Sequence, residues 1–190
     1  SYTFVITNNG PDWAGGGVLT DALPAGVSYD LVLALPLDDA AGATQFQDVS
    51  GRGNHGACSG DACPIAGVSG RYGQAAQFDG TDDYVIWQPA DDFPATEITA
   101  LFWMRSSDDS KAGTPLSYAS TAHNNDFLIF DYRNLAIYRG GDTGPTSVSV
   151  NDGNWHHIAV TWRSSDGQVI VYKDGAAAYG GTLSPGTGIK

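Results

Sequence analysis

The stretch DGNWHHIAVTWRSSDGQVIVYKDGAAAYGGTL, residues 152–183, decides the fold class of this chain. Residues 155–163 alternate with the period of two that is typical of a β-strand, where successive side chains point to opposite faces. One face would carry His157, Ala159 and Thr161, and the other Ile158, Val160 and Trp162. Asp166-Gly167 and Lys173-Asp174-Gly175 are turn sequences that precede two further strands, at 168–172 and 176–183. The stretch therefore predicts three consecutive strands.

The sequence upstream of this stretch has the same strand character. Apolar, β-branched and aromatic residues predict strands at 31–39, in two pieces of 74–87 around Asp79-Gly80, and at 96–106. They also predict a hairpin at 126–132 and 134–139. A long polar loop, 48–73, lies between the first two of these segments. Helical periodicity does not extend beyond one or two turns in any window, so we expect an all-β chain.

Four motifs, in this order along the chain, resemble a laminin-G-like domain of the concanavalin A-like lectin/glucanase superfamily. They are GRYGQAAQFDGTDDYVIW (70–87), ITALFWMRS (98–106), DGNWHHIAVTW (152–162) and VIVYKDG (169–175). The resemblance covers about residues 31–190 and implies a two-sheet jelly-roll sandwich that binds carbohydrate, protein or calcium. Members of this family usually continue beyond the KDG hairpin with two more strands. We therefore expect residues 31–190 to form a jelly roll that lacks its last strands.

The N-terminal 30 residues follow a different pattern. Residues 1–29 resemble the Ig-like DUF11 repeat of prokaryotic surface proteins, through NNGP at 8–11 and TDALPAGV at 20–27. Strands are predicted at 2–7, with Tyr2, Phe4 and Ile6 on one face, and at 17–23. Because two strands cannot bury a core, we expect this Ig-like fragment to complete another sandwich by strand exchange, in one chain or between chains. The alternative is that the sequence is an excerpt.

Composition and charge narrow the range of functions. The chain has 190 residues, 42% of them apolar and 16% charged, which excludes disorder driven by charge. Its 21 acidic and 9 basic residues give a net charge of −12, so nucleic acid and anionic membranes are excluded as partners and a divalent cation is favoured. No apolar stretch is long enough to span a membrane.

Two cysteines, Cys58 and Cys63, lie in the sequence CSGDAC. Four intervening residues do not suit a redox pair, and no second pair of metal-ligating residues is present. We predict a local disulfide, which indicates an extracellular or cell-surface location. The alternative is a pair of reduced thiols in a cytosolic loop.

Two loops carry oxygen ligands in a spacing that suits calcium. Asp48, Ser50 and Asn54 alternate around glycines, and Asp79 and Asp82 flank the Gly80 turn. Hard cations bind flexible loops of this kind, so both loops are candidate Ca²⁺ sites. The alternative for the first loop is an Asx turn, in which Asp and Asn side chains bond to their own backbone.

Catalytic signatures are lacking in the sequence. His156 and His157 are neighbours on a strand, so they point to opposite faces and cannot share a metal, and we interpret them as structural. Glu97 is the only glutamate, which excludes catalytic mechanisms that need a pair of glutamates. The side chains of the consecutive aspartates Asp82-Asp83 and Asp91-Asp92 are expected to diverge, so neither pair suits glycoside hydrolysis. The GxGxxG spacing at 51–56 does not begin a helix, so we interpret it as a tight loop.

Aromatic side chains are candidates for a sugar platform, namely Trp87, Trp103, Tyr118, Tyr132 and Tyr138. We expect Trp103, Trp155 and Trp162 to lie in the core, as most aromatic residues of a β-sandwich do.

The sequence thus predicts a non-catalytic adhesion or binding module of a prokaryotic surface protein. Its expected partners are carbohydrate or a surface protein, with Ca²⁺ as the cofactor. The alternative is a structural subunit, a homo-oligomer or filament that assembles through its N-terminal strands. An accessory domain of a glycan-active enzyme ranks third.

Overall fold

The computed structural model describes residues 31–88 and 93–190. The chain divides into two compact units, Ser1–Asp30 and Leu31–Lys190. The first unit lies outside the described residues, and with it the strands predicted at 2–7 and 17–23, the side chains Tyr2, Phe4 and Ile6, and the DUF11 resemblance. These therefore remain predictions.

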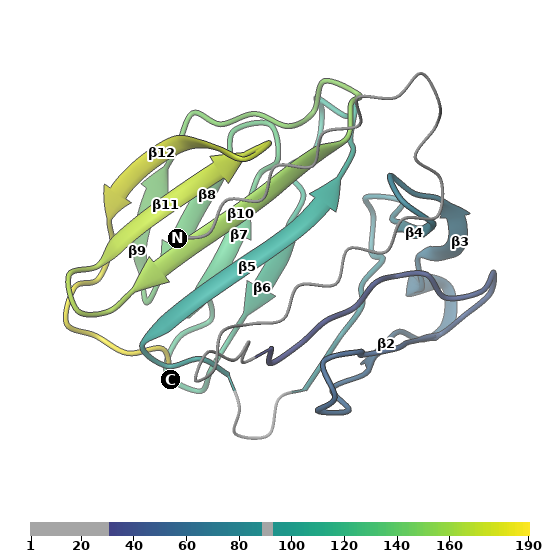
Figure 1. Ribbon diagram of the computed structural model, residues 1–190, viewed down its shortest axis with the longest axis horizontal. Coiled ribbons are helices and arrows are strands. Elements are labelled where there is room, and N and C mark those ends of the chain that lie inside the picture. Colours follow the sequence, from purple (N-terminus) through teal and green to yellow (C-terminus); the bar gives the residue numbers. More distant parts are fainter. Residues whose placement is uncertain (1–30, 89–92) are drawn as a thin grey trace, which may run out of the picture. The chain divides into compact units, whose positions relative to one another are not determined.

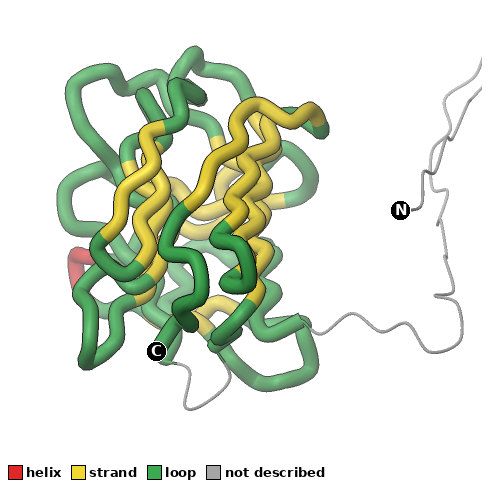
Figure 2. The backbone as a smooth tube through the Cα atoms, turned by 90° about the vertical axis from the view of Figure 1, so that its left-hand side faces the viewer, coloured by secondary structure: helices red, strands yellow, loops and turns green. Residues whose placement is uncertain are grey.

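Two four-stranded antiparallel sheets form the main body of the second unit (Figure 1). The first sheet has the order β12 (Ala176–Thr182), β11 (Gln168–Lys173), β10 (His156–Arg163) and β5 (Glu97–Met104). The second has the order β6 (Leu116–Tyr118), β7 (Phe127–Phe130), β8 (Ala136–Arg139) and β9 (Asp142–Pro145). Seen from the side, the strands form two layers (Figure 2). No α-helix occurs in the described part of the chain, so the prediction of an all-β jelly-roll sandwich is confirmed.

The core lies between these two sheets. Its fully buried side chains come from both layers, including Ile158, Val160 and Trp162 of β10 and Phe127, Ile129 and Ile137 of β7 and β8. Trp162 is 2% exposed, and its Nε1 donates a hydrogen bond to the carbonyl of Leu183 at 3.0 Å. The predicted alternation of β10 is confirmed, because every second residue from His156 to Trp162 is buried.

The turn between β11 and β12 has the hairpin geometry that the Lys173-Asp174-Gly175 sequence predicts. Asp174 and Gly175 have φ angles of 53° and 82°. Two successive positive φ angles define a type I′ turn, whose twist matches that of the flanking strands and which favours the Asp-Gly pair.

A buried ion pair between Arg139 and Asp126 connects the C-terminal residue Lys190 to the second sheet. The Nη1 atom of Arg139 lies 2.6 Å from Oδ1 of Asp126, and Oδ2 of Asp126 accepts a hydrogen bond of 2.9 Å from the backbone N–H of Lys190. Burial lowers the pKa of Arg139 and the Asp126 charge raises it, with a net decrease. Because both side chains are buried, removal of either partner would leave an uncompensated charge in the core.

A smaller part, residues 31–88, has two short hairpins and a core of its own. The hairpins are β1 (Gln45–Phe46) with β2 (Gly56–Ala57) and β3 (Ile65–Ser69) with β4 (Gln74–Gln77). A 3₁₀ turn, Gly60–Ala62, lies between the cysteines, and Phe46, Cys58 and Ala66 are buried together. The predicted Cys58–Cys63 disulfide is present.

Two predicted strands in this part are wrong. Residues 31–39 form no strand, because Pro36 lacks an N–H donor and Leu37 has a φ of 59°, which is incompatible with an extended ladder. Leu35 and Leu37 still pack against the small core. The second piece of 74–87 contributes only a single bridge, from Ile86 to Ala57.

Candidate functional site

An aromatic platform, which we define as Arg71, Tyr72, Trp103 and His157, gathers on the outer face of the first sheet. Trp103 of β5 and His157 of β10 are cross-strand partners. Their strand neighbours Phe102 and Ile158 face the core, so Trp103 and His157 face away from it. Arg71 and Tyr72 come from the tight turn between β3 and β4, where the N–H of Gly70 donates to the carbonyl of Gly73 at 3.1 Å.

The rings of the platform are in contact and open to solvent. Tyr72 meets Trp103 edge to face, with ring centroids 5.7 Å apart and an interplanar angle of 82°. His157 lies 5.3 Å from Trp103 on the other strand. The exposed fractions are 67% for Tyr72 and 39% for Trp103. A large apolar side chain on the same face of β5, Leu101, is 65% exposed.

The guanidinium of Arg71 lies beside both the Tyr72 and the Trp103 ring. It is 5.1 Å from the centroid of Tyr72 and 5.5 Å from that of Trp103. Both distances are within the range of a cation–π interaction. No carboxylate of the described residues forms an ion pair with Arg71, in contrast to Arg133, Arg139 and Arg163.

The prediction that Trp103 lies in the core is therefore wrong. Its place on β5 puts it on the outer face, and the alternation in β5 assigns the inner face to Ile98, Ala100, Phe102 and Met104. Trp162 is buried as predicted, and Trp155 is half-buried with Arg105 over its ring. The other candidate rings, Trp87, Tyr118, Tyr132 and Tyr138, are half-buried.

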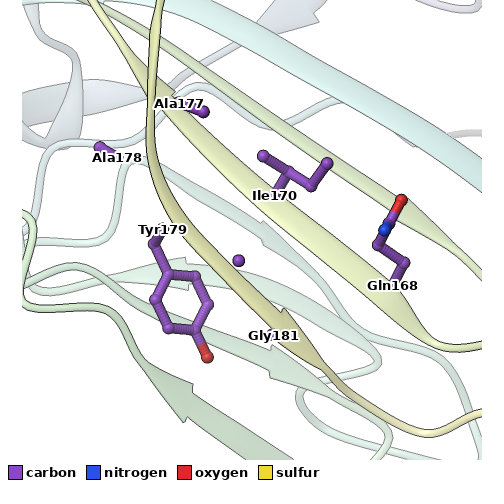
Figure 3. A pocket seen from close by; sticks show the side chains of 7 residues that line it. Gln168, Ile170, Ala177, Ala178, Tyr179 and Gly181 are labelled. Atoms are coloured by element: carbon purple, nitrogen blue, oxygen red, sulfur yellow. The ribbon is translucent and has the colours of Figure 1, made fainter.

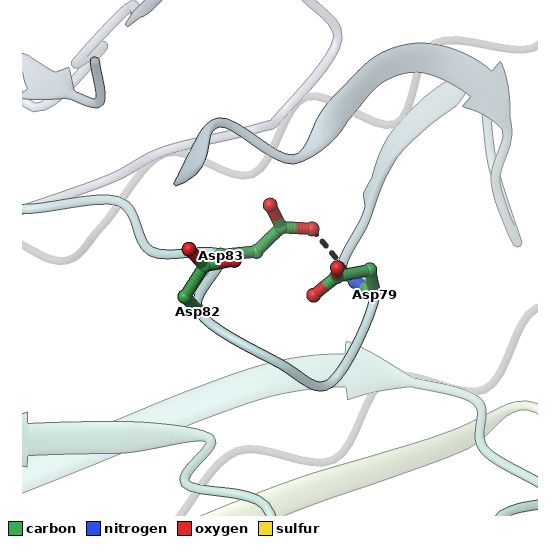
Figure 4. A group of neighbouring side chains, drawn as sticks. All are labelled: Asp79, Asp82 and Asp83. Carbon is green, nitrogen blue, oxygen red and sulfur yellow. Dashed lines mark hydrogen bonds between the residues drawn. The ribbon is translucent and has the colours of Figure 1, made fainter. Parts of the chain in front are cut away.

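An acidic cluster of Asp79, Asp82 and Asp83 forms the loop that follows β4 (Figure 4). Each residue offers a carboxylate oxygen, and these oxygens lie within 4.8 Å of one another. Oδ2 of Asp83 accepts a hydrogen bond from the N–H of Asp79 at 2.6 Å, and Oδ1 of Asp79 accepts one from Thr81 at 2.7 Å. The loop is thus braced while each of these two residues keeps a second carboxylate oxygen.

The electrostatics at Asp79 favour its ionised form. A hydrogen bond from the backbone of Thr81 is the main cause that lowers the pKa of Asp79, and the charge of Lys111 lowers it further. Nζ of Lys111 donates to the carbonyl of Gly80 at 2.9 Å. The expectation that Asp82 and Asp83 diverge is wrong, because Asp82 lies in a bend and neither residue belongs to a strand, so their carboxylate oxygens come within 4.8 Å. Sequence reasoning therefore missed Asp83 as part of this cluster.

The other predicted calcium loop is organised by a single carboxylate. Oδ1 of Asp48 accepts hydrogen bonds from the N–H groups of Ala34 and Ser50, both at 2.9 Å. Oδ2 accepts the hydroxyl of Ser50 at 2.7 Å and the N–H of Asn54 at 2.9 Å. The Nδ2 of Asn54 donates to the carbonyl of Val32 at 2.7 Å. These bonds form the Asx-type loop that the sequence indicated as the alternative to a calcium site. Calcium binding at Asp48, Ser50 and Asn54 remains a prediction.

Those hydrogen bonds also set the charge state of Asp48. Burial raises the pKa of this carboxyl, but the hydrogen bonds from Ser50, Ala34 and Asn54 outweigh it and hold the pKa far below its ordinary value. The carboxylate is therefore ionised throughout the physiological range. Gly51 and Gly53 of the GxGxxG spacing lie in the same loop with positive φ angles, and no helix begins there, as expected.

An open hollow of about 440 Å³ lies over β11 and β12 (Figure 3). Gln168 and Ile170 of β11 and residues 177–181 of β12 line it. Most of the lining side chains on β12 are alanine or glycine, and the lining residues include no charged side chain. The hollow thus offers few groups that would orient a ligand.

The two neighbouring histidines have separate environments. His156 is buried and lies between two carboxylates, with Nδ1 2.7 Å from Asp174 and Nε2 3.0 Å from Asp152. His157 is half-buried on the opposite face. The prediction that they cannot share a metal agrees with this geometry, and the two contacts of His156 are structural because they join β10 to its flanking turns.

Comparison with known proteins adds family evidence to this geometry. A sequence model of the concanavalin A-like lectin/glucanases superfamily matches residues 79–189, more than half of the chain. Mouse "Sushi, von Willebrand factor type A, EGF and pentraxin domain-containing protein 1" is 50% identical over 95 residues, which cover 48% of this chain and 3% of that protein. Human neuronal pentraxin-1 is 35% identical over 91 residues, 46% of this chain and 21% of the relative.

Human neuronal pentraxin-2 is 34% identical over 80 residues, which cover 41% of this chain and 19% of the relative. The chain thus spans only a small part of the length of these curated relatives. In the described ranges there is no helix with the length and apolar character needed to cross a bilayer.

Proposed function

We propose, on the premise that this chain belongs to the concanavalin A-like lectin/glucanases superfamily, that it is a non-catalytic carbohydrate-binding module of a secreted or surface-attached protein. The observation that carries the proposal is the exposed pair of Tyr72 and Trp103 on the outer face of the first sheet. The Cys58–Cys63 disulfide supports an oxidising, extracellular location. The prokaryotic surface origin predicted from residues 1–29 is part of the proposal.

The platform has the physical properties that a sugar ring requires. A pyranose has an apolar face of C–H groups, and its packing on an indole removes apolar surface of both partners from water. Trp103 is fixed by its strand and by contacts with Tyr72 and His157, so little side-chain entropy is lost when a ligand binds. The open shape of the site suits the end or the side of a glycan chain.

The test is a glycan array probed with the wild-type protein and with two variants. Trp103→Ala should reduce binding by at least about tenfold, because most of the stacking surface is removed. Phe78→Ala is the matched control, since Phe78 is 48% exposed and has no recorded ring contact. Equal binding by wild type and Trp103→Ala, with both folded by near-UV circular dichroism, would reject the platform.

We also propose that the acidic cluster binds Ca²⁺. Three exposed carboxylates in one loop match the oxygen ligands that hard cations prefer, and water can supply the remaining ligands. Asp79, Asp82 and Asp83 would hold the ion, which would stabilise the loop between β4 and the bridge at Ile86.

Ca²⁺ binding should raise the melting temperature by mass action, and a chelator should reverse the effect. Asp82→Asn should abolish the Ca²⁺-dependent increase, whereas Asp61→Asn, an exposed aspartate outside the cluster, should not. A calcium response that is the same in wild type and Asp82→Asn would exclude this loop as the site.

A second candidate function is assembly by strand exchange, in which the N-terminal strand of one molecule pairs with a sheet of another. One observation favours it: β5 is the last strand of its sheet, and no other strand of the described residues pairs with its outer edge. An edge with which no described strand pairs is suited to β-augmentation, and the side chain of Leu101 on this strand is 65% exposed. The donor would be residues 2–7, through Tyr2, Phe4 and Ile6.

A further inference from the structure

We propose that the platform recognises an acidic sugar, one that carries a carboxylate, through the guanidinium of Arg71. This inference rests on the proposed carbohydrate function and specifies its ligand class. The chain carries an excess of negative charge, with 21 acidic and 9 basic residues. Three of its six arginines, Arg133, Arg139 and Arg163, form ion pairs with carboxylates. Within the described residues, Arg71 instead contacts the rings of Tyr72 and Trp103.

The way in which Arg71 is held leaves its hydrogen-bond donors free. A guanidinium packs on an aromatic ring through its planar face, while its N–H groups point outward in the plane of the fork. Two rings, with centroids 5.1 Å and 5.5 Å from the guanidinium carbon, contact the group, and because they are nearly perpendicular its planar face can pack on only one of them. Arg71 is exposed and forms no ion pair with a carboxylate of the described residues, so N–H donors remain for a ligand. Arg71 is therefore a preorganised cation beside an exposed indole.

A carboxylated pyranose fits both parts of this arrangement. Its ring would stack on Trp103, and its carboxylate would accept two parallel hydrogen bonds from Arg71, the geometry for which the guanidinium fork is suited. His157 forms the other wall of the platform, 5.3 Å from the indole. A neutral sugar can satisfy the stacking surface but leaves the Arg71 donors to water.

The overall charge limits the ligand further. A net charge of −12 repels a densely charged polyanion over distances of about a Debye length. The favoured ligand is thus a glycan with isolated carboxylates, such as a uronic or sialic acid residue, and not a heavily sulfated chain.

Two matched pairs of probes test the inference by calorimetry at physiological salt. One pair is galacturonic acid and its methyl ester, and the other is 3′-sialyllactose and lactose. The wild type should bind the acidic member of at least one pair about tenfold more tightly than the neutral one, the strength typical of a charge-assisted bidentate contact. Arg71→Gln should remove this preference, so that the acidic and the neutral member of each pair bind with equal affinity.

Control variants separate this inference from the proposed function. Arg105→Gln is the matched control, because Arg105 also packs on a tryptophan. Its guanidinium carbon lies 5.2 Å from the ring centroid of Trp155. It should retain the acidic preference. If wild type shows no preference in either pair, or keeps it in Arg71→Gln, the acidic-sugar inference is overturned. Glycan binding that still depends on Trp103 would then leave the proposed function intact, whereas loss of that dependence would overturn both.

Discussion

Asp48 shows how one side chain can organise a loop that has little regular secondary structure. Its two oxygens accept four hydrogen bonds, from residues 34, 50 and 54, and so join the 31–37 segment to the 48–54 loop. We predict that Asp48→Ala lowers the free energy of unfolding by about 2 kcal/mol, a figure reduced for the partial exposure of these bonds. Urea unfolding would measure it, with Asp39→Ala, whose recorded contact is one bond of 3.1 Å, as the control.

The same variant distinguishes the two interpretations of this loop. If Asp48 is a hydrogen-bond acceptor, the destabilisation will be equal with Ca²⁺ and with chelator. The lowered pKa means that the wild-type contribution is present above pH 3.8 and is lost only as pH falls through the much lower pKa of the folded state. A destabilisation that is larger with Ca²⁺ than with chelator would instead support the calcium prediction for Asp48, Ser50 and Asn54.

At the scale of elements, His156 joins β10 to the turns on either side of the strand. Asp152 belongs to the turn before β10, and Asp174 to the β11–β12 turn, where it also accepts the N–H of His157 at 2.9 Å. Burial lowers the pKa of His156 and Lys173 lowers it further, but hydrogen bonds to Asp174 and Asp152 outweigh both and raise it above 6.5. The protonated form donates to both carboxylates at once.

Because the pKa is raised in the folded state, this stabilisation is complete below about pH 6.5 and declines as pH rises through the folded-state pKa. We predict that His156→Gln will be less stable than wild type in weak acid and that the difference will shrink as pH rises through the raised pKa of the folded state. Chemical denaturation across this interval would measure it, with the exposed His123→Gln as the control. A difference between His156→Gln and wild type that does not vary with pH would refute the linkage.

At the scale of the whole molecule, strand exchange would couple assembly to the free edge of β5. We predict that wild type forms oligomers whose mass increases with concentration, measured by light scattering after gel filtration. Phe4→Asp should abolish them at the donor, because an aspartate on the apolar face of a strand is costly to bury. Leu101→Lys should abolish them at the acceptor edge, since edge lysines oppose strand pairing.

Ile65→Lys is the control for the acceptor variant, because Ile65 is 62% exposed on β3, outside the four-stranded sheets. It should leave the oligomers unchanged. A deletion of residues 1–29 that alters neither folding nor oligomeric state would rule out strand exchange and leave the carbohydrate-binding proposal unaffected.

The sequence by itself determined the strands of the last third of the chain. There the period-two alternation of β10 and the Asp-Gly turn before β12 agree with the final structure, because each depends on neighbours in the chain. The local Cys58–Cys63 disulfide was predictable for the same reason. Short strands such as β6 and β9 were missed, because they form only through pairing with β7 and β8.

Only the tertiary structure decided which side of an alternating strand is covered. Trp103 follows the same alternation as a core residue would, and it is exposed because no second sheet packs on that face of β5 within the described residues. Arg71 and Tyr72 reach it from a turn about thirty positions earlier, and a bend rather than a strand brings Asp83 beside Asp79. Periodicity fixes the direction of side chains relative to their own strand, whereas burial and contact depend on which distant segments fold against it.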